Sequence, residues 1–314
     1  MNRFPGILCC GNMVLDILVR PFEQPTWGAT QWVESIGQQI GGNGAGTSYS
    51  IAKLGVPARL VSETGSDALA DTILRTLGSV NVDLRWVRRS PLPTPATIAL
   101  VRTDGARSLL HSPGVSGEAL SEPVEITSAL LEGCTRFHLA NVFGLPKLRA
   151  HAADLLRRMK EAGLATSLDT GWDSRGEWLS TLGPCLAHTD LCFVNEDEAR
   201  WLTGEEGHRQ AARALRDAGA GTVVLKLGAN GCALFNDSGE TRVPGFSVPV
   251  VDTTGAGDCF AGGFLAALQR GFSLEEAARF ANAVGALSVQ ALGGITGLRE
   301  FEETILWMAS QNRV

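Results

Sequence analysis

The sequence predicts an α/β protein with a mostly parallel sheet and a second, smaller sheet that projects from the main body. Two observations predict this class. Short apolar strand patterns alternate with helical patterns along most of the chain, which favours parallel βαβ units. Two segments, approximately 12–36 and 86–111, are instead rich in strand patterns and poor in helical ones. We therefore expect a single domain over residues 1–314, with these two segments forming the projecting sheet.

Composition and charge exclude several classes of protein. Of the 314 residues, 44% are hydrophobic and 19% are charged, which supplies a large core and too little charge for disorder. The formal net charge of −6 argues against nucleic acid or an anionic membrane as the main partner, because phosphate binding needs concentrated positive charge. The sequence holds neither an apolar leader nor a stretch of ~18 uncharged apolar residues, so we expect a cytoplasmic protein. The seven cysteines have no paired metal spacing and are expected to be buried thiols.

The amino-terminal half begins with two strand patterns. An apolar run at residues 7–10 predicts the first strand, and alternation over 14–19 predicts the second, with the acidic Asp16 inside it. A short strand is expected at 31–36, followed by a glycine-rich turn at 41–46 that opens a helix. The next elements are strands at 59–62, 86–89, 96–102 and 108–111, with a helix at 68–77 after the first of them.

The carboxyl-terminal half continues the alternation of strands and helices. Strands are expected at 136–139, 165–169, 191–194 and 222–227, and helices at 145–162, 198–202 and 274–288. Residues 231–236 and 241–243 resemble an antiparallel hairpin.

The most informative motif is the heptapeptide Asp-Thr-Thr-Gly-Ala-Gly-Asp at residues 252–258. Small and apolar residues with helical spacing follow it, so Gly255 and Gly257 are expected at a helix N-terminus, where free N–H groups and the helix dipole favour an anion. A carboxylate beside a bound anion, such as Asp258, makes sense if it takes a proton from the group that attacks the anion. The motif therefore favours phosphoryl transfer to a hydroxyl group with Asp258 as the base. Simple helix capping by Asp252 or Asp258 is the alternative.

This heptapeptide resembles the second signature of the ribokinase-like, or pfkB-type, carbohydrate kinases. The turn at 41–46 with the segment 52–55 resembles the first signature of that family. The segment 195–198 resembles its Asn-x-x-Glu motif, and 226–231 resembles its nucleotide-side loop. The resemblance implies a ribokinase-like three-layer α/β/α core with a small β-sheet lid.

The resemblance also implies roles for individual residues in an ATP- and Mg²⁺-dependent reaction. Asp258 would be the catalytic base, and the amides of Gly255, Ala256 and Gly257 would form the anion hole. Asn195 and Glu198 would act on the Mg²⁺ and phosphate side, largely through water, although Glu198 also suits the first turn of a helix. The residues implied at the nucleotide are Lys226, Gly228, Gly231 and Asn282.

A monovalent cation site is implied by resemblance to potassium-activated relatives. The matching residues are Asp252, Thr254, Ser288, Ala291, Gly293 and Gly297. A plain glycine-rich turn is the alternative for this segment.

The acceptor side combines matches to the family pattern with departures from it. Asp16 resembles the aspartate that accepts hydrogen bonds from sugar hydroxyls, and a buried carboxylate in an apolar strand needs such a partner. The turn residues Gly41, Gly42 and Asn43 are expected in the same pocket. Further candidates are Asn12, Asn141 and the lid residues Arg102, Arg107 and His111. Three positions depart from the ribokinase pattern, so ribose itself is not favoured as the acceptor: Val14, Asn43 and Gly46.

The leading hypothesis is therefore an ATP-dependent kinase that phosphorylates a small-molecule sugar or sugar acid. A nucleoside kinase of the same family is the second hypothesis, because the departures from the ribokinase pattern also fit a different pocket that carries aromatic residues. Trp27 and Trp32 could stack on a base or on a sugar face, or pack against a partner lid. A catalytically silent sugar-binding protein on the same fold is a third. A phosphorylated acceptor would need cations at the pocket mouth, where Arg102, Arg107 and Lys147 are candidates. Related lids often pair, which leads us to expect a homodimer through the lid.

Overall fold

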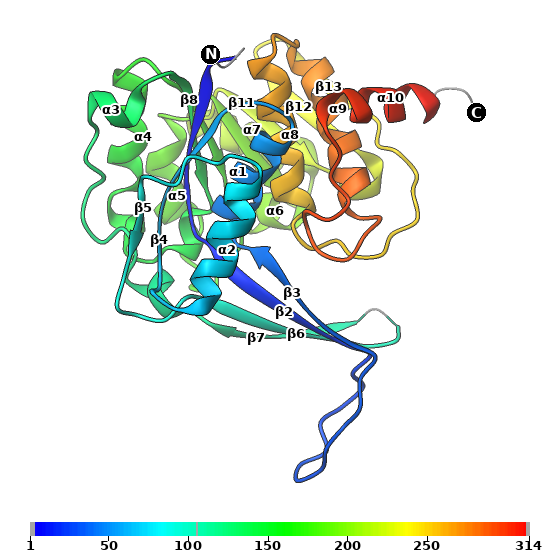
Figure 1. Ribbon diagram of the computed structural model, residues 1–314. Coiled ribbons are helices and arrows are strands. Elements are labelled where there is room, and N and C mark those ends of the chain that lie inside the picture. Colours follow the sequence, from blue (N-terminus) through cyan, green and yellow to red (C-terminus); the bar gives the residue numbers. More distant parts are fainter. Residues whose placement is uncertain (1–3, 105, 312–314) are drawn as a thin grey trace.

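The computed structural model describes residues 4–104 and 106–311, and its main feature is a nine-stranded sheet in the order β13-β12-β11-β10-β9-β8-β1-β4-β5 (Figure 1). From β5 to β11 all neighbouring strands are parallel, while β12 runs antiparallel to β11 and to β13. The strands are β1 (Gly6–Gly11), β4 (Ala58–Thr64), β5 (Val87–Arg89), β8 (Cys134–Ala140), β9 (Ala165–Asp169), β10 (Leu191–Asn195), β11 (Thr222–Lys226), β12 (Cys232–Asn236) and β13 (Gly239–Val243).

Helices cover both faces of this sheet, so the three-layer α/β/α core is confirmed. Every residue of β1 is buried, as expected for a central parallel strand that is covered on both sides. On one face pack α3 (Ser128–Leu131), α4 (Ala152–Glu161), α5 (Leu179–Leu186), α6 (Glu196–Thr203) and α7 (His208–Asp217). On the other pack α1 (Asn43–Lys53), α2 (Ala68–Ser79), α8 (Ala256–Gln269), α9 (Leu274–Ser288) and α10 (Phe301–Gln311).

A four-stranded sheet projects from this core, in the order β3-β2-β6-β7 (Figure 1). Its strands are β2 (Val14–Arg20), β3 (Ser35–Gly41), β6 (Ala96–Val101) and β7 (Arg107–Ser112). β2 pairs antiparallel with β3 and parallel with β6, and β7 closes the sheet antiparallel to β6.

Two predicted boundaries of the small sheet are wrong. The strand expected at 31–36 lies at Ser35–Gly41, because pairing with β2 fixes its register and leaves 21–34 as a long exposed loop. The strand expected at 86–89 in the small sheet is instead the edge strand β5 of the large sheet, because the crossover through α2 returns the chain beside β4.

The helix expected at 145–162 also begins later, at Ala152. Two short 3-10 turns, at Val142–Gly144 and Leu148–Ala150, precede it. They flank Pro146, which has no N–H group to donate.

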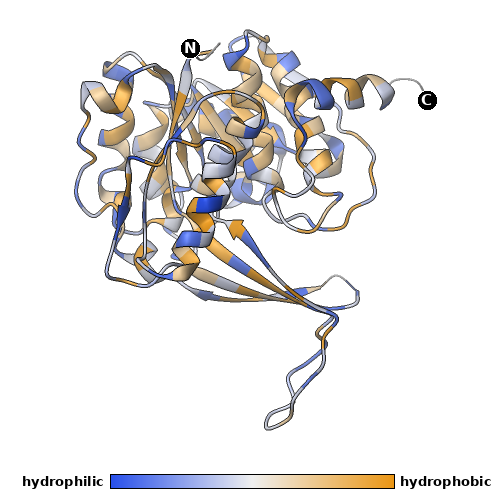
Figure 2. Cartoon of the chain, viewed as in Figure 1, coloured by the Kyte–Doolittle hydropathy of each residue, from blue (hydrophilic) through white to orange (hydrophobic). Residues whose placement is uncertain are grey.

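In the described ranges, no helix has the length and apolarity needed to cross a bilayer. All seven cysteines are free thiols, six of them buried and Cys134 half-buried. Figure 2 shows apolar residues, in orange, within the strands of both sheets.

Candidate active site

The turn at 252–258 leads into helix α8, as its sequence predicts. Gly255 caps the helix with a left-handed φ of 69°, a conformation that glycine adopts without strain. A Cβ atom on Gly255 would stand 2.9 Å from Cα of Gly294, so the backbones of the two loops are in close contact. The N–H of Ala256 donates to the carbonyl of Thr253 at 3.3 Å. The first turn of α8 is therefore held by backbone contacts.

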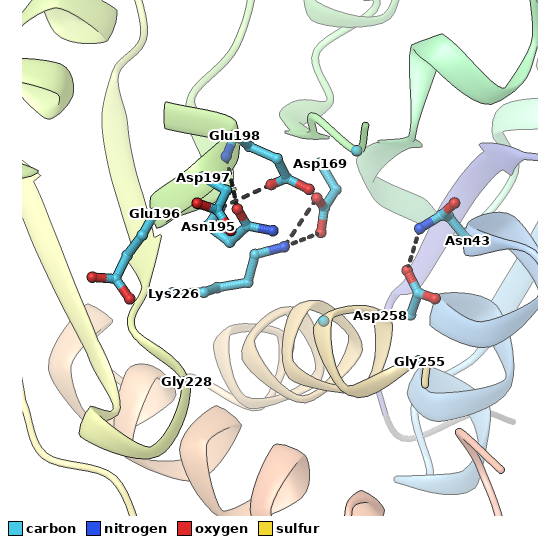
Figure 3. A pocket seen from close by; sticks show the side chains of 12 residues that line it. Asn43, Asp169, Asn195, Glu196, Asp197, Glu198, Lys226, Gly228, Gly255 and Asp258 are labelled. Atoms are coloured by element: carbon cyan, nitrogen blue, oxygen red, sulfur yellow. Dashed lines mark hydrogen bonds and ion pairs between the residues drawn. The ribbon is translucent and has the colours of Figure 1, made fainter. Parts of the chain in front are cut away.

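Asp258 lies in this first turn and lines a cavity of about 360 Å³ (Figure 3). Strand ends and helix starts from far-apart parts of the chain form the walls of this cavity. They are Asn43, Asp169, Gly171, Asn195, Glu196, Asp197, Glu198, Lys226, Gly228, Gly255 and Gly257. The carboxylate of Asp258 thus faces a cavity instead of the protein core.

A chain of side-chain amides leads to Asp258. Nδ2 of Asn43 donates to Oδ1 of Asp258 at 2.7 Å (Figure 3). Nδ2 of Asn141 donates in turn to Oδ1 of Asn43 at 2.7 Å. Asn12 accepts at 3.0 Å from the backbone N–H of Asn43 and so caps α1. Gly42, at φ 84°, allows the chain to enter the helix beside the backbone of Asn12. The sequence identifies these residues as candidates but does not predict that they bond to one another.

The pKa of Asp258 is raised from its ordinary value to about 7. Burial is the main cause, and the negative charge of Asp169 adds to it. The hydrogen bond from Asn43 and the positive charge of Lys226 lower the pKa and partly offset these effects. A carboxyl group with a pKa near 7 suits a general base that works at neutral pH.

Lys226 forms a buried ion pair that the sequence analysis missed. Its Nζ lies 3.0 and 2.9 Å from the two carboxylate oxygens of Asp169 (Figure 3). Burial alone would lower the pKa of Lys226, but the charges of Asp169 and Glu198 outweigh burial and raise it, so the ammonium stays charged. A Cβ atom on Gly257 would stand 3.4 Å from Nζ, which places the ammonium beside the turn that opens α8. Asp169 ends a correctly predicted strand. Its position at the carboxyl edge of a parallel sheet, where ligands commonly bind, could have identified it as a candidate site residue.

Asn195 and Glu198 form a capping box at the start of α6. Oδ1 of Asn195 accepts from the N–H of Glu198 at 2.8 Å, and Oε2 of Glu198 accepts from the N–H of Asn195 at 2.8 Å. Oε2 of Glu198 also accepts from Oγ1 of Thr170 at 3.0 Å. Burial raises the pKa of Glu198, against the opposing charge of Lys226. The helix-start alternative for Glu198 therefore holds, while both residues still line the cavity of Asp258.

A second cavity, of about 310 Å³, adjoins the first at Lys226, Gly228 and Gly257 and has mostly apolar walls. Gly231 lines it at φ 88°, where a Cβ atom would stand 2.2 Å from the carbonyl of Val243. The amide of Asn282 donates to the carbonyls of Val243 and Pro244, both at 3.1 Å. Asn282 thus holds the loop after β13 against α9, at the edge of this slot.

The predicted acceptor residue Asp16 lines a third cavity, of about 760 Å³, between the small sheet and the loop at 250–254. A Cβ atom on Gly41 would stand 2.2 Å from Oδ2 of Asp16, so glycine leaves room for this carboxylate. Burial raises the pKa of Asp16, partly offset by a hydrogen bond from Thr97 and the proximity of His111. Nδ1 of His111 lies 3.1 Å from Oγ1 of Thr97.

The structure separates two groups that the sequence analysis places in one pocket. Asn43 lines the cavity of Asp258, whereas Asp16 lines the cavity under the small sheet. The two cavities adjoin where Thr254 meets Gly255, because each residue lines one of them.

Two of the residues implied for a monovalent cation, Thr254 and Gly293, bond to Asp252. Its Oδ1 accepts from the N–H and Oγ1 of Thr254 at 2.9 and 2.7 Å, and its Oδ2 accepts from the N–H of Gly293 at 3.0 Å. Nη1 of Arg107 reaches the same place from the small sheet, 2.6 Å from Oγ1 of Thr254. Ser288 and Ala291 lie in the turn that ends α9, and Gly297 lies against the carbonyl of Leu287.

Comparisons with known proteins match the chain to one family of kinases. Residues 11–300 match the sequence model described as "pfkB family carbohydrate kinase". The chain is 31% identical over 283 residues to an ATP-dependent ribose-1-phosphate kinase of Halopiger xanaduensis, covering 90% of this chain and 91% of that protein. It is also 31% identical over 271 residues to an aminoimidazole riboside kinase of Salmonella typhimurium, covering 82% and 84% of the two chains.

A solved structure of Arabidopsis thaliana ribokinase complexed with ribose and ATP has the same fold. Its TM-score is 0.85 at 27% identity, and the match covers 97% of this chain and 99% of that one. The ribokinase fold is thus shared over nearly the whole length. The match to the family model over residues 11–300 shows that the chain belongs to the pfkB family of carbohydrate kinases.

Proposed function

We propose that this kinase transfers the γ-phosphoryl group of ATP to a hydroxyl group of a sugar or sugar acid. One observation carries the proposal: the carboxylate of Asp258, with a pKa of about 7, lines a cavity in the first turn of α8. In this proposal Asp258 is the base that takes the proton of the acceptor hydroxyl.

The amides of Gly255, Ala256 and Gly257 are the proposed anion hole. The N-terminus of α8 supports this role, because its N–H groups and the helix dipole favour negative charge. The ammonium of Lys226, beside Gly257, adds positive charge on the same side of the cavity. These groups stabilise charge on the transferred phosphoryl group while Asp258 holds the attacking hydroxyl.

ATP fits the apolar slot between Gly228 and α9, which joins the cavity of Asp258. Gly228 and Gly231 line the slot, Gly231 lets the chain pass close to the backbone of Val243, and Asn282 fixes the loop that borders the slot. A nucleotide in this slot would have its γ-phosphate on the side of Gly257, which lines both cavities.

The oxygen-rich cavity wall fits Mg²⁺ that arrives with the nucleotide. Among the described residues no three acidic, cysteine or histidine side chains are grouped to hold a metal by themselves. Mg²⁺ commonly keeps several waters and takes one or two carboxylates plus phosphate oxygens, which matches Asn195 and Glu198 acting through water. When bound, Mg²⁺ neutralises charge on the phosphates.

The acceptor lies, in this proposal, between the small sheet and Asp258, with Asp16 and His111 on the lid side. The side chain of Asn141 donates to that of Asn43, which donates to Asp258, so these two amides position the base. Oδ1 of Asn12 accepts from the backbone N–H of Asn43 and so positions the turn at Gly41 and Gly42. Closure of the small sheet would exclude water and protect ATP from hydrolysis.

A nucleoside acceptor is the second candidate, and the similarity to an aminoimidazole riboside kinase favours it. The aromatic residues that first suggested it do not, because the side chains of Trp27 and Trp32 are 93% and 94% exposed on the loop after β2. The similarity to an ATP-dependent ribose-1-phosphate kinase favours a phosphorylated acceptor in the same way, but each candidate cation for its phosphate already has a carboxylate partner. These cations are Arg102, Arg107 and Lys147.

A coupled assay for ADP with ATP and Mg²⁺ tests the proposal across four acceptor sets: sugars, sugar acids, sugar phosphates and nucleosides. We expect turnover with a sugar or sugar acid. Turnover with nucleosides alone would support the second candidate, and turnover with none of the four sets would contradict a carbohydrate kinase activity.

We further propose that the chain forms a homodimer through the small sheet. The cross-strand pairs Ile17–Ile98, Ile98–Leu110 and Val19–Ile36 put apolar residues on the face opposite Asp16. Ile36 and Leu110 are 67% and 57% exposed in the single chain, so a second copy that buries them gains apolar contact.

Light scattering tests the dimer with the variant Ile98→Lys. We expect a dimer mass for the native chain and a monomer mass for this variant at micromolar concentration. Leu306→Lys, which changes an exposed leucine on α10, is the matched control and should remain a dimer. A monomer mass for the native chain would contradict the dimer.

A further inference from the structure

Arg107 connects the small sheet to the turn that opens α8. It is the first residue of β7, and its Nη1 lies 2.6 Å from Oγ1 of Thr254 and 3.5 Å from Oδ1 of Asp252. The side chain of Asp252 is 10% exposed, so the guanidinium lies next to a largely buried carboxylate. Thr254 directly precedes the helix cap Gly255.

Asp252 joins the two loops that shape this turn. Its Oδ1 accepts from Thr254, and its Oδ2 accepts from the N–H of Gly293. The neighbouring Gly294 lies against Gly255, and its carbonyl accepts from Sγ of Cys259 at 2.8 Å. The position of the α8 N-terminus therefore depends on the charge and hydrogen bonds of Asp252.

The oxygens expected to hold a monovalent cation here already have partners. Both carboxylate oxygens of Asp252 accept hydrogen bonds, and the hydroxyl of Ser288 donates to the carbonyl of Gly285 at 2.8 Å. The carbonyl of Gly293 accepts from the N–H of Thr296 at 3.3 Å. A potassium ion on Asp252 would also lie close to the like charge of Arg107. While Arg107 occupies this place, the residues therefore do not fit the implied potassium site.

We propose that Arg107 acts as a tethered cation that takes the place of a potassium ion beside the anion hole. It is a positioning residue: its guanidinium holds Asp252 and Thr254, which fix the backbone of Gly255. Because Arg107 belongs to the small sheet, its charge reaches the site only when that sheet lies against the core. The inference rests on the proposed anion hole at the start of α8.

The test compares potassium chloride with choline chloride at equal ionic strength, using the full chain. The variants are Arg107→Met, which keeps the aliphatic stem, and Arg107→Lys, which keeps the charge. We expect the native rate to agree within twofold in the two salts. In choline chloride the kcat of Arg107→Met should be at least tenfold below that of the native chain. In potassium chloride the kcat of this variant should be at least fivefold higher than in choline chloride.

Melting temperature supplies a readout that needs neither turnover nor a known acceptor. Potassium should raise the melting temperature of Arg107→Met by about 2–4 °C relative to choline, because binding to the folded state stabilises it. The native chain and Arg107→Lys should show no such difference. If no acceptor is phosphorylated, the proposed function fails while this measurement still decides the role of Arg107.

Arg102→Met is the matched control. It removes a positive charge from the same sheet, but Arg102 pairs with Glu23 and Asp104. Its response to potassium should equal that of the native chain. The inference is overturned if potassium activates the native enzyme more than fivefold, or if Arg107→Met responds to potassium in neither rate nor melting temperature.

Discussion

The side-chain amide of Asn43 donates a hydrogen bond to the carboxylate of Asp258 across 2.7 Å, and so joins residues 215 positions apart in the chain. This bond favours the charged form of the carboxylate, while burial and the charge of Asp169 oppose it. The balance leaves the pKa of Asp258 at about 7. Asn43 therefore controls the pH at which the proposed base becomes active.

Asn43→Ala should move the acidic limb of the pH profile of kcat/KM upward. The proposed base works when deprotonated, so the native rate should rise through about pH 7. Removing the donor raises the pKa of Asp258, and the limb should shift by about one pH unit toward alkaline pH. The control is Asn230→Ala, in the 3-10 turn after β11, which should leave the acidic limb of the pH profile at its native pH. Asn43→Asp is not a suitable control, because it adds a charge. A limb that stays at its native pH in Asn43→Ala would contradict this role.

The raised pKa of Asp258 also predicts a pH-dependent cost in stability. Because the folded pKa of about 7 exceeds the ordinary value of 3.8, the stability that this group contributes is full below about pH 4 and is lost as the pH rises through 7. Asp258→Asn should therefore increase the free energy of unfolding by about 2–3 kcal/mol more near pH 8.5 than near pH 5, because only part of the loss has occurred at pH 5. Urea denaturation at the two pH values measures the difference. Equal effects at both values would show that the carboxyl has no raised pKa.

Lys226→Met should destabilise the fold by about 3–5 kcal/mol, because it leaves the carboxylate of Asp169 buried without its partner. The double variant Asp169→Asn with Lys226→Met should recover part of this loss, since no charge then remains unpaired. Urea denaturation of the two single variants and the double variant gives the coupling. Strict additivity of the two single effects would argue against the ion pair.

Ala286→Leu should fill part of the apolar slot proposed for ATP. Ala286 lines this slot from α9, and leucine is a good helix former, so the helix itself should be preserved. We expect KM for ATP to rise at least tenfold while KM for the acceptor stays within twofold. The matched control is Glu275→Leu, because Glu275 is exposed on the same helix. Ala278→Leu would not serve, because Ala278 lies in the core. An unchanged KM for ATP would exclude this slot.

Local patterns account for the elements that the sequence predicts well. The strand at 165–169 and the helix at 274–288 have the bounds that their apolar spacing indicates. The motif at 252–258 likewise opens a helix where its glycines and small residues predict one. Local periodicity and capping residues determine where these elements begin and end, so the sequence predicts them.

Long-range contacts account for what the sequence analysis missed. β3 begins four residues after its expected start, at Ser35, because pairing with β2 sets its register. The bonds from Asn43 to Asp258 and from Arg107 to Thr254 join distant segments, and no spacing in the sequence encodes them. The same holds for Lys226, whose partner Asp169 comes from a strand that is two places away in the sheet.

The turnover of Asp258→Asn tests the central claim most directly. Asparagine keeps the size of the side chain and can still accept the hydrogen bond from Asn43, but it cannot take a proton. We expect kcat to fall by about 10²–10⁴ with KM for ATP nearly unchanged, and the exposed control Asp237→Asn to keep the native rate. A folded Asp258→Asn enzyme whose kcat remains within tenfold of the native value would contradict the assignment of Asp258 as the base.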